Sequence, residues 1–149
     1  MSNSLELSLH HIGYAVKTIE PAAGQYVERY GYELCTPVIH DPLQKAQVQF
    51  LRLPGDAAYL EFVAPDSPES ELNNAVKRGG TLHHLCYAAN SLEQTIDRLE
   101  DEGMLVVSEP KIAVAFAGRR ICWLMDDNRL LVELVERRDK SDSCTPGIA

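Results

Sequence analysis

The sequence predicts an α+β protein built from two tandem β-α-β-β-β modules. The first observation is an internal repeat: the segment LHHIGYAV at residues 9–16 returns as LHHLCYAA at residues 82–89, 73 positions later. The second is a pair of apolar segments with a central glutamate, LEFV at residues 60–63 and VELV at residues 132–135, which lie 72 positions apart. Two nearly equal offsets at distant places indicate a duplicated unit.

Each histidine segment reads as a strand, and a helical pattern follows it. Apolar residues recur at helical spacing over residues 19–30 and again over residues 92–99. Gly31 and Gly103 follow these patterns, as expected for glycines that end helices in the left-handed conformation. The second helix also begins on a capping-box sequence, SLEQ at residues 91–94.

Three further strands are expected after each helix. The last strand of each module is the one that carries the central glutamate. We expect strands at residues 33–39, 46–53 and 60–63 in the first module and at 104–108, 119–125 and 132–135 in the second, with proline turns at Pro42 and Pro110.

A module of roughly 55 to 60 residues is marginal alone, so the two modules are expected to share a core. The sequence therefore predicts a single domain over residues 5–136. Module one spans about residues 8–65, a linker with a short helix spans 66–81, and module two spans about 82–136. The polar residues 137–149 are expected to form a flexible C-terminal tail.

Composition restricts the class of protein and of partner. The chain has 149 residues, and 45% of them are hydrophobic, which is typical of a soluble globular protein. Its net charge of −8 disfavours nucleic acid or an anionic membrane as the main partner. No apolar run approaches the roughly 18 residues of a transmembrane helix, and the N-terminus lacks a signal-peptide pattern. The four cysteines form no CxxC pair, which favours a reduced, cytoplasmic protein.

The histidine strands contain candidate metal ligands. Side chains alternate faces along a strand, so His11 and His84 each share a face with small residues, which leaves room for a ligand above the sheet. His10 and His83 fall on the opposite faces, whose larger apolar residues are typical of packing against a helix. We therefore choose His11 and His84 as ligands, with His10 and His83 as the competing candidates.

Glu61 and Glu133 complete the candidate set. Each carboxylate lies inside an apolar strand, where it must be paired, hydrogen-bonded or bound to a metal. Glu61 follows His11 by 50 positions and Glu133 follows His84 by 49, so pseudo-twofold packing of the modules would gather all four. Two imidazoles and two carboxylates suit one divalent cation, with Zn, Ni, Co, Mn, Fe and Mg all open.

The motifs HHIGYAV, LEFVAP, GGTLHHLCYAA and LLVELVE resemble those of the vicinal oxygen chelate superfamily, in its methylmalonyl-CoA epimerase and glyoxalase I-like branch, over residues 9–136. The resemblance implies the glyoxalase/bleomycin resistance fold, in which the two modules form one half-open mixed β barrel around a metal. It also implies a homodimer and metal ligands at His11, Glu61, His84 and Glu133.

This resemblance implies a metal-dependent isomerase, similar to methylmalonyl-CoA epimerase, that removes and returns a proton next to a metal-polarised carbonyl, with Glu133 or Glu61 as the base. The substrate would be an acyl-CoA or a thiol adduct. One alternative is a glyoxalase I-like lactoylglutathione lyase, favoured by Glu61 because many epimerases carry glutamine there. The other is a binding protein of the bleomycin-resistance type that sequesters an antibiotic.

Four further residues are candidates for substrate binding. Arg119 and Arg120 begin a strand and could receive a carboxylate or a CoA phosphate, although we favour the alternative that they form a solvated strand start. Gln47 and Gln49 stand in a strand where some epimerases of this family place a second, basic glutamate, and a glutamine cannot act as that base. Two aromatic residues lie 73 positions apart and are expected in the core or a cleft wall: Phe50 and Trp123.

Overall fold

The computed structural model describes residues 5–148, which divide into two compact units. The N-terminal unit comprises residues 11–83. The C-terminal unit comprises residues 84–148 together with residues 5–10. Among the described residues, no helix is both long enough and apolar enough to cross a membrane.

The N-terminal unit is a mixed sheet with one long helix. Strand β1 runs parallel to β5, β5 runs antiparallel to β4, and β4 pairs antiparallel with both β2 and β3. Parallel neighbours such as β1 and β5 must be joined by a crossover connection, and helix α1 forms the first part of that connection. The elements are β1 (Ser8–Ala15), α1 (Ile19–Tyr30), β2 (Glu33–Leu34), β3 (Ile39–Asp41), β4 (Ala46–Arg52), β5 (Tyr59–Pro65) and the short α2 (Leu72–Ala75).

The C-terminal unit repeats this pattern. Strand β6 runs parallel to β9, β9 runs antiparallel to β8, and β8 runs antiparallel to β7. The α+β class and the duplicated β-α-β-β-β order predicted from the sequence are therefore confirmed. The elements are β6 (Thr81–Ala89), α3 (Leu92–Asp101), β7 (Leu105–Ile112), β8 (Arg120–Met125) and β9 (Leu131–Glu136).

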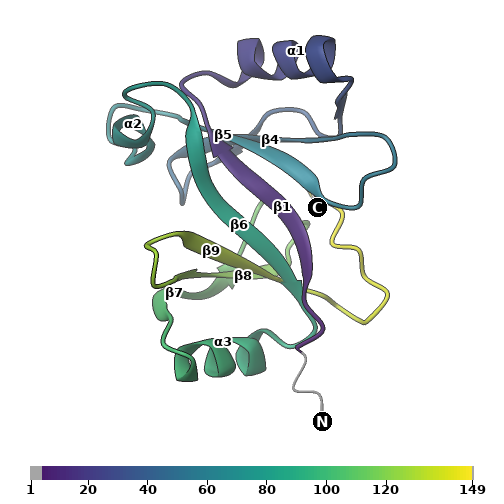
Figure 1. The fold of residues 1–149 in the computed structure, drawn as a ribbon, viewed down its shortest axis with the longest axis vertical. Helices are drawn as coiled ribbons and strands as arrows, with labels where there is room; N and C mark the ends of the chain where they lie inside the picture. The colour runs from purple at the N-terminus through teal and green to yellow at the C-terminus, as the bar shows by residue number, and fades with distance from the viewer. Residues whose placement is uncertain (1–4, 149) are drawn as a thin grey trace. The chain divides into compact units, whose positions relative to one another are not determined.

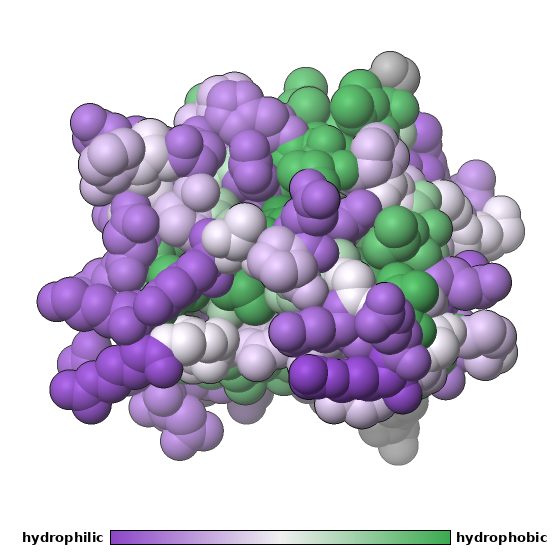
Figure 2. All heavy atoms as spheres, turned by 90° about the horizontal axis from the view of Figure 1, so that it is seen from above, coloured by the Kyte–Doolittle hydropathy of each residue, from purple (hydrophilic) through white to green (hydrophobic). Residues whose placement is uncertain are grey.

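Helix α1 covers one face of β4 and β5 (Figure 1). Its buried residues Ile19 and Ala23 pack with Leu51 and Phe62 in the core of the N-terminal unit. The helix ends at Gly31, whose φ of 82° is the left-handed conformation expected of that glycine. Seen from the side of α1, hydrophilic residues cover much of the surface, with hydrophobic residues between them (Figure 2).

Helix α3 holds the equivalent place in the C-terminal unit, against β7 and β9 (Figure 1). The Ser91 hydroxyl accepts a hydrogen bond of 3.3 Å from the backbone N–H of Gln94, so the predicted N-terminal cap is present. Leu92 of the helix packs with Leu124 and Leu134 of the sheet. Each unit thus has its own core between one helix and one face of its strands, which leaves the other face of those strands for a site.

Two strand predictions need correction. The single strand expected over residues 33–39 is two short strands, β2 and β3, with Pro37 between them. Strand β7 continues through Pro110, where a turn was expected. The β7–β8 register shifts between Ser108 and Lys111, so Pro110 stands where the ladder is interrupted and its missing N–H costs no paired hydrogen bond.

The segment after β9 makes specific contacts within the C-terminal unit. Asp142 receives two hydrogen bonds from the Arg119 guanidinium, at 2.8 Å from Nε and 2.7 Å from Nη2. Cys144 is fully buried, and its carbonyl oxygen lies 2.8 Å from His10 Nε2. Sequence reasoning missed these contacts over residues 137–148, because they depend on partners distant in the chain; Ala149 lies outside the described residues.

The Arg119–Asp142 pair predicts a pH-dependent contribution to stability. Arg119 holds the pKa of Asp142 well below its ordinary range, so the carboxylate stabilises the fold above the unfolded-state pKa of about 3.9 and this contribution is lost as the pH falls below it. We expect Asp142→Asn to lower the free energy of unfolding by about 2–3 kcal/mol at neutral pH, since it breaks a largely buried ion pair.

Urea denaturation between about pH 7 and about pH 3 measures this effect, with the deficit of the variant narrowing toward acid. Asp97→Asn, an exposed site on α3, is the matched control and should leave stability nearly unchanged. If the loss of unfolding free energy in Asp142→Asn stayed the same from about pH 7 to about pH 3, the charge of Asp142 would not be its source.

Candidate metal centre

The N-terminal unit places one predicted histidine beside one predicted glutamate. His11 stands on β1 and Glu61 on β5, where the parallel register sets Glu61 opposite Gly13, two residues beyond His11. The His11 Nε2 atom lies 3.2 Å from Glu61 Oε1. His11 is 0% exposed and Glu61 is 5% exposed, so both polar groups lie in the interior of the unit.

The C-terminal unit repeats the arrangement with different neighbours. Glu133 on β9 stands opposite Cys86 of β6, which again lies two residues beyond the histidine, His84. The His84 Nε2 atom lies 3.3 Å from Glu133 Oε1, and these residues are 1% and 4% exposed. The repeat seen in the sequence is therefore also a repeat of one buried imidazole–carboxylate pair.

The donor atoms of each pair fit the coordination shell of a small divalent cation. Ligands about 2.1 Å from a metal lie about 3.0 Å apart at octahedral angles and about 3.4 Å apart at tetrahedral angles. The two measured separations, 3.2 Å and 3.3 Å, fall within this interval. Each pair is thus a possible set of two adjacent ligands, with the nitrogen and oxygen donors that Zn, Ni, Co, Mn and Fe accept.

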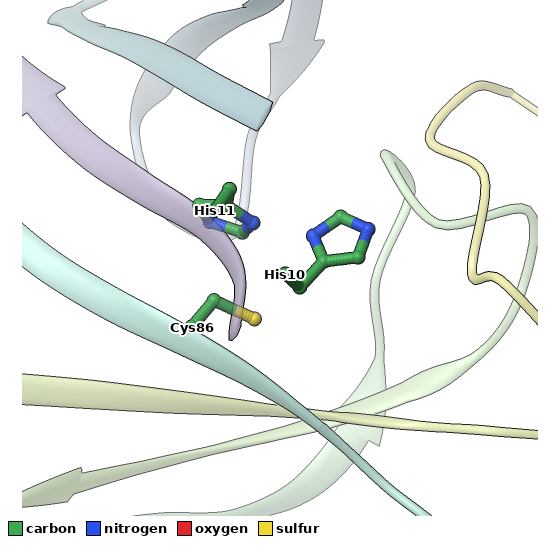
Figure 3. A group of neighbouring side chains, drawn as sticks. All are labelled: His10, His11 and Cys86. Atoms are coloured by element: carbon green, nitrogen blue, oxygen red, sulfur yellow. The ribbon is translucent and has the colours of Figure 1, made fainter. Parts of the chain in front are cut away.

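The competing histidines have other surroundings. The rings of His10 and His11 leave β1 in different directions (Figure 3, which also draws Cys86 of β6). His10 Nε2 lies 2.8 Å from the carbonyl oxygen of Cys144, and its ring meets Phe116 edge to face. His83 is half-buried, whereas the neighbouring His84 is buried.

The two predicted arginines are held by carboxylates of the C-terminal unit. Arg119 binds Asp142 through two hydrogen bonds, and Arg120 forms ion pairs with Glu136 and Glu93. These carboxylates raise the pKa of Arg120 further above its ordinary range. The roles of Arg119 and Arg120 in substrate binding stay predictions.

The two predicted glutamines lie on the other face of β4 from the His11–Glu61 pair. In the antiparallel register Phe50 stands opposite Glu61, while Gln49 stands opposite Phe62 of the helix-side core. The Gln49 amide donates to the carbonyl oxygen of Thr36 at 2.9 Å, whereas Gln47 is exposed. The glutamate-side face of β4 therefore carries Ala46, Val48, Phe50 and Arg52, none of which has a carboxylate or an imidazole.

Sequence reasoning missed one cation on the glutamate-side face of β4. Arg52 is two residues beyond Phe50 and therefore shares its face. Its guanidinium carbon lies 4.5 Å from the centre of the Tyr59 ring. Tyr59 in turn stands opposite His11 in the β1–β5 register and meets Phe50 edge to face. Nothing in the sequence singles out Arg52, because its relevance depends on this register.

A sequence profile of the Glyoxalase/Bleomycin resistance protein/Dioxygenase superfamily matches residues 10–123. The chain belongs to this superfamily. The match includes both histidine segments from His10 onward and the first glutamate strand, and it ends before the second glutamate strand. The family resemblance inferred from the motifs is confirmed.

Several relatives are named as epimerases. The chain is 29% identical over 130 residues to the ethylmalonyl-CoA/methylmalonyl-CoA epimerase of Cereibacter sphaeroides, covering 85% of this chain and 95% of the relative. The crystal structure of methylmalonyl-CoA epimerase from Mycobacterium tuberculosis is 27% identical and superposes with a TM-score of 0.76 over 91% of each chain.

A third relative is a methylmalonyl-CoA epimerase solved in complex with methylmalonyl-CoA and NH4+. It is 25% identical to this chain, covers 93% of it and 98% of its own length, and has a TM-score of 0.73. The expected glyoxalase/bleomycin resistance fold is thus the fold of this chain.

The buried pairs predict a measurable energetic coupling in the metal-free protein. His84→Leu or Glu133→Leu alone leaves one polar group of the pair without this partner in the interior, whereas the double variant removes both. We expect a coupling free energy of about 1–3 kcal/mol from a double-mutant cycle in the presence of a chelator, and the same for His11 with Glu61.

Urea denaturation of the four proteins in each cycle gives the coupling. The control is the pair formed by His40 and Asp66, whose 2.7 Å contact involves a His40 side chain that is 58% exposed, so its coupling should stay below about 1 kcal/mol. Additive effects at His84 and Glu133 would show that these residues are neighbours without an energetic interaction.

Proposed function

We propose that the two imidazole–carboxylate pairs together bind one divalent metal ion, with His11, Glu61, His84 and Glu133 as its ligands. The repetition of the pair supports this proposal: both modules hold a histidine and a glutamate in the same register, at the same separation and in the same burial. A protein that needed only stable strands would fill these interior positions with apolar residues, since each buried pair carries a desolvation cost.

We propose that the protein is a metal-dependent isomerase of the methylmalonyl-CoA epimerase type. The support is the combination of the buried His–Glu pairs with relatives of 25–29% identity over most of the chain that are named as such epimerases. The substrate class is an acyl-CoA with an acidic C–H bond between two carbonyl groups. Its product differs only in the configuration at that carbon.

The reaction requires removal of the α-proton and its return to the other face of the carbon. A bound divalent cation would supply Lewis-acid polarisation of the carbonyl oxygen. The chain must supply the proton acceptor. On the glutamate-side faces of β1, β4 and β5 the carboxylate in the interior is Glu61, and on those of β6, β8 and β9 it is Glu133. We therefore assign proton transfer to these two glutamates.

An anionic substrate also needs a cation to orient it. Arg52 supports this role better than the arginines of β8, because its guanidinium lies over Tyr59 on the same face as His11 and Glu61. A guanidinium can bind a carboxylate or phosphate through two parallel hydrogen bonds. We propose that Arg52 binds the anionic part of the acyl-CoA.

A glyoxalase I-like lactoylglutathione lyase is the second candidate. It uses the same initial proton removal but returns the proton to the neighbouring carbon. The observation that favours it is the ligand set itself, in which both modules supply glutamate. An antibiotic-binding protein of the same superfamily would not require four buried ligand residues.

We also propose that the protein acts as a cytoplasmic homodimer. Strands β2 and β7 each pair with one other strand in the described residues, so their outer edges can accept another strand. Strand β7 additionally exposes large apolar side chains, namely Leu105, Val107 and Ile112. The absence of a CxxC pair among the four cysteines supports a reducing compartment.

Metal analysis joined to proton exchange tests the proposed function. Wild-type protein loaded with Co, Ni, Mn or Zn should bind about one cation per chain and exchange the α-proton of methylmalonyl-CoA into deuterated water. Replacing any of the four ligands by alanine should weaken metal binding by more than about 100-fold. His83→Ala is the matched control, since it removes the imidazole adjacent to His84 and should keep the metal.

A parallel assay with methylglyoxal and glutathione discriminates the lyase, which would form a lactoyl thioester. Exchange of the methylmalonyl-CoA α-proton without formation of a lactoyl thioester supports the epimerase. Formation of the lactoyl thioester without exchange of that α-proton would show that the protein is the lyase instead. Undiminished metal content in all four alanine variants would overturn the ligand assignment.

The role of Arg52 gives a separate kinetic prediction. Arg52→Gln removes one charge-assisted interaction with the substrate, so KM should rise about 10- to 100-fold while kcat changes little. Arg120→Gln is the comparison, since that arginine already binds Glu136 and Glu93. Steady-state kinetics with methylmalonyl-CoA separate the two: a larger KM effect for Arg120→Gln would transfer the role to β8.

A further inference from the structure

Each ligand histidine meets an aromatic ring edge to face. The ring centres of His11 and Phe50 lie 5.2 Å apart with an interplanar angle of 86°. The ring centres of His84 and Trp123 lie 4.8 Å apart, also at 86°. The same contact therefore occurs in both units, with a phenyl ring in one and an indole ring in the other.

The register explains why both aromatic residues reach their histidines. Phe50 on β4 stands opposite Glu61 on β5, and Trp123 on β8 stands opposite Glu133 on β9. Each aromatic side chain is thus a cross-strand neighbour of the glutamate and a ring neighbour of the histidine in the same pair. On that face the preceding residues of the two strands, Val48 and Ile121, are aliphatic, and the following ones are Arg52 and Met125.

An imidazole needs such a neighbour to act as a precise ligand. Rotation about the Cβ–Cγ bond of histidine has broad minima, so packing or a hydrogen bond must fix the ring plane. A perpendicular aromatic contact stabilises the ring beyond area burial and is lost when the imidazole turns. The contact therefore restricts the imidazole to the ring plane in which Nε2 lies beside the glutamate.

We propose that Phe50 and Trp123 are positioning residues that fix the imidazole planes of His11 and His84 for metal binding. This inference rests on the proposed metal centre and adds to it the residues that orient its nitrogen ligands. The ring shape is the required property, so a different aromatic side chain preserves the function while an aliphatic one of comparable size does not.

Cobalt binding by Trp123 variants tests the inference. Trp123→Leu should weaken Co²⁺ affinity about tenfold and change the visible ligand-field spectrum of the bound Co²⁺, because the imidazole loses its fixed plane. Trp123→Phe should restore both toward the wild-type values. Leu124→Ala is the stability-matched control: Leu124 is fully buried in the helix-side core, so its loss should destabilise the fold without changing the spectrum.

The N-terminal unit provides an independent repeat of the test. Phe50→Leu should weaken Co²⁺ affinity about tenfold. Phe50→Tyr should preserve the affinity, because it keeps the aromatic ring that contacts the imidazole. Trp123 is the sole tryptophan of the chain, so its fluorescence reports from this position alone. Paramagnetic Co²⁺ should quench it in the wild type and in the Phe50 variants.

The outcomes separate the inference from the proposed function. Wild-type protein that fails to bind Co²⁺ overturns the metal centre and the inference with it. Wild-type binding with unchanged affinity and spectrum in Trp123→Leu overturns the inference alone. Loss of affinity in Leu124→Ala equal to that in Trp123→Leu also overturns it, because general destabilisation would then account for the effect.

Discussion

The parallel pairing of the first and last strands of each module determines the rest of the structure. In that register the glutamate stands opposite the residue two positions beyond the histidine, so the two side chains share a face and pair at N–O distances of 3.2 and 3.3 Å. A shift of one residue would move the glutamate to the helix-side core, where Phe62 and Leu134 pack. The hydrophobic core therefore fixes the register, and the register fixes the polar pair.

The same constraint explains the composition of the surrounding strands. The face toward the helix carries large aliphatic and aromatic residues in both units, and the face toward the pair carries glycine, alanine or cysteine next to each histidine. Small side chains beside an imidazole supply fewer contacts than large ones would. Small residues at these positions suit the proposed metal site, since large side chains next to the histidines would exclude a ligand.

The sequence was sufficient to predict the duplicated modules, the two long helices and the fold family, because each depends on local periodicity or on a repeat. It also identified His11, Glu61, His84 and Glu133 as the polar residues at equivalent interior positions. The sequence could not indicate Arg52, the two arginine ion pairs or the contacts of Cys144, since these depend on which strands are neighbours and how they are aligned. The turn predicted at Pro110 was wrong because the β7–β8 register shifts there. No paired backbone hydrogen bond is needed at that position, so the strand can contain a proline.

The absence of acid–base groups on β4 next to Phe50 has a consequence for the chemistry. A protein with this fold could carry its proton acceptor on a strand next to the metal ligands. The pKa of the acceptor and the affinity for the metal would then depend on different residues. Here the glutamate-side face of β4 carries Ala46 and Val48, and that of β8 carries Ile121 and Met125. In the proposed mechanism, proton transfer and cation binding would therefore fall to the same carboxylates, Glu61 and Glu133. Under that proposal the histidines would have to hold the cation while a glutamate accepts the proton, so fixed imidazole planes would matter more than in a protein with a separate base.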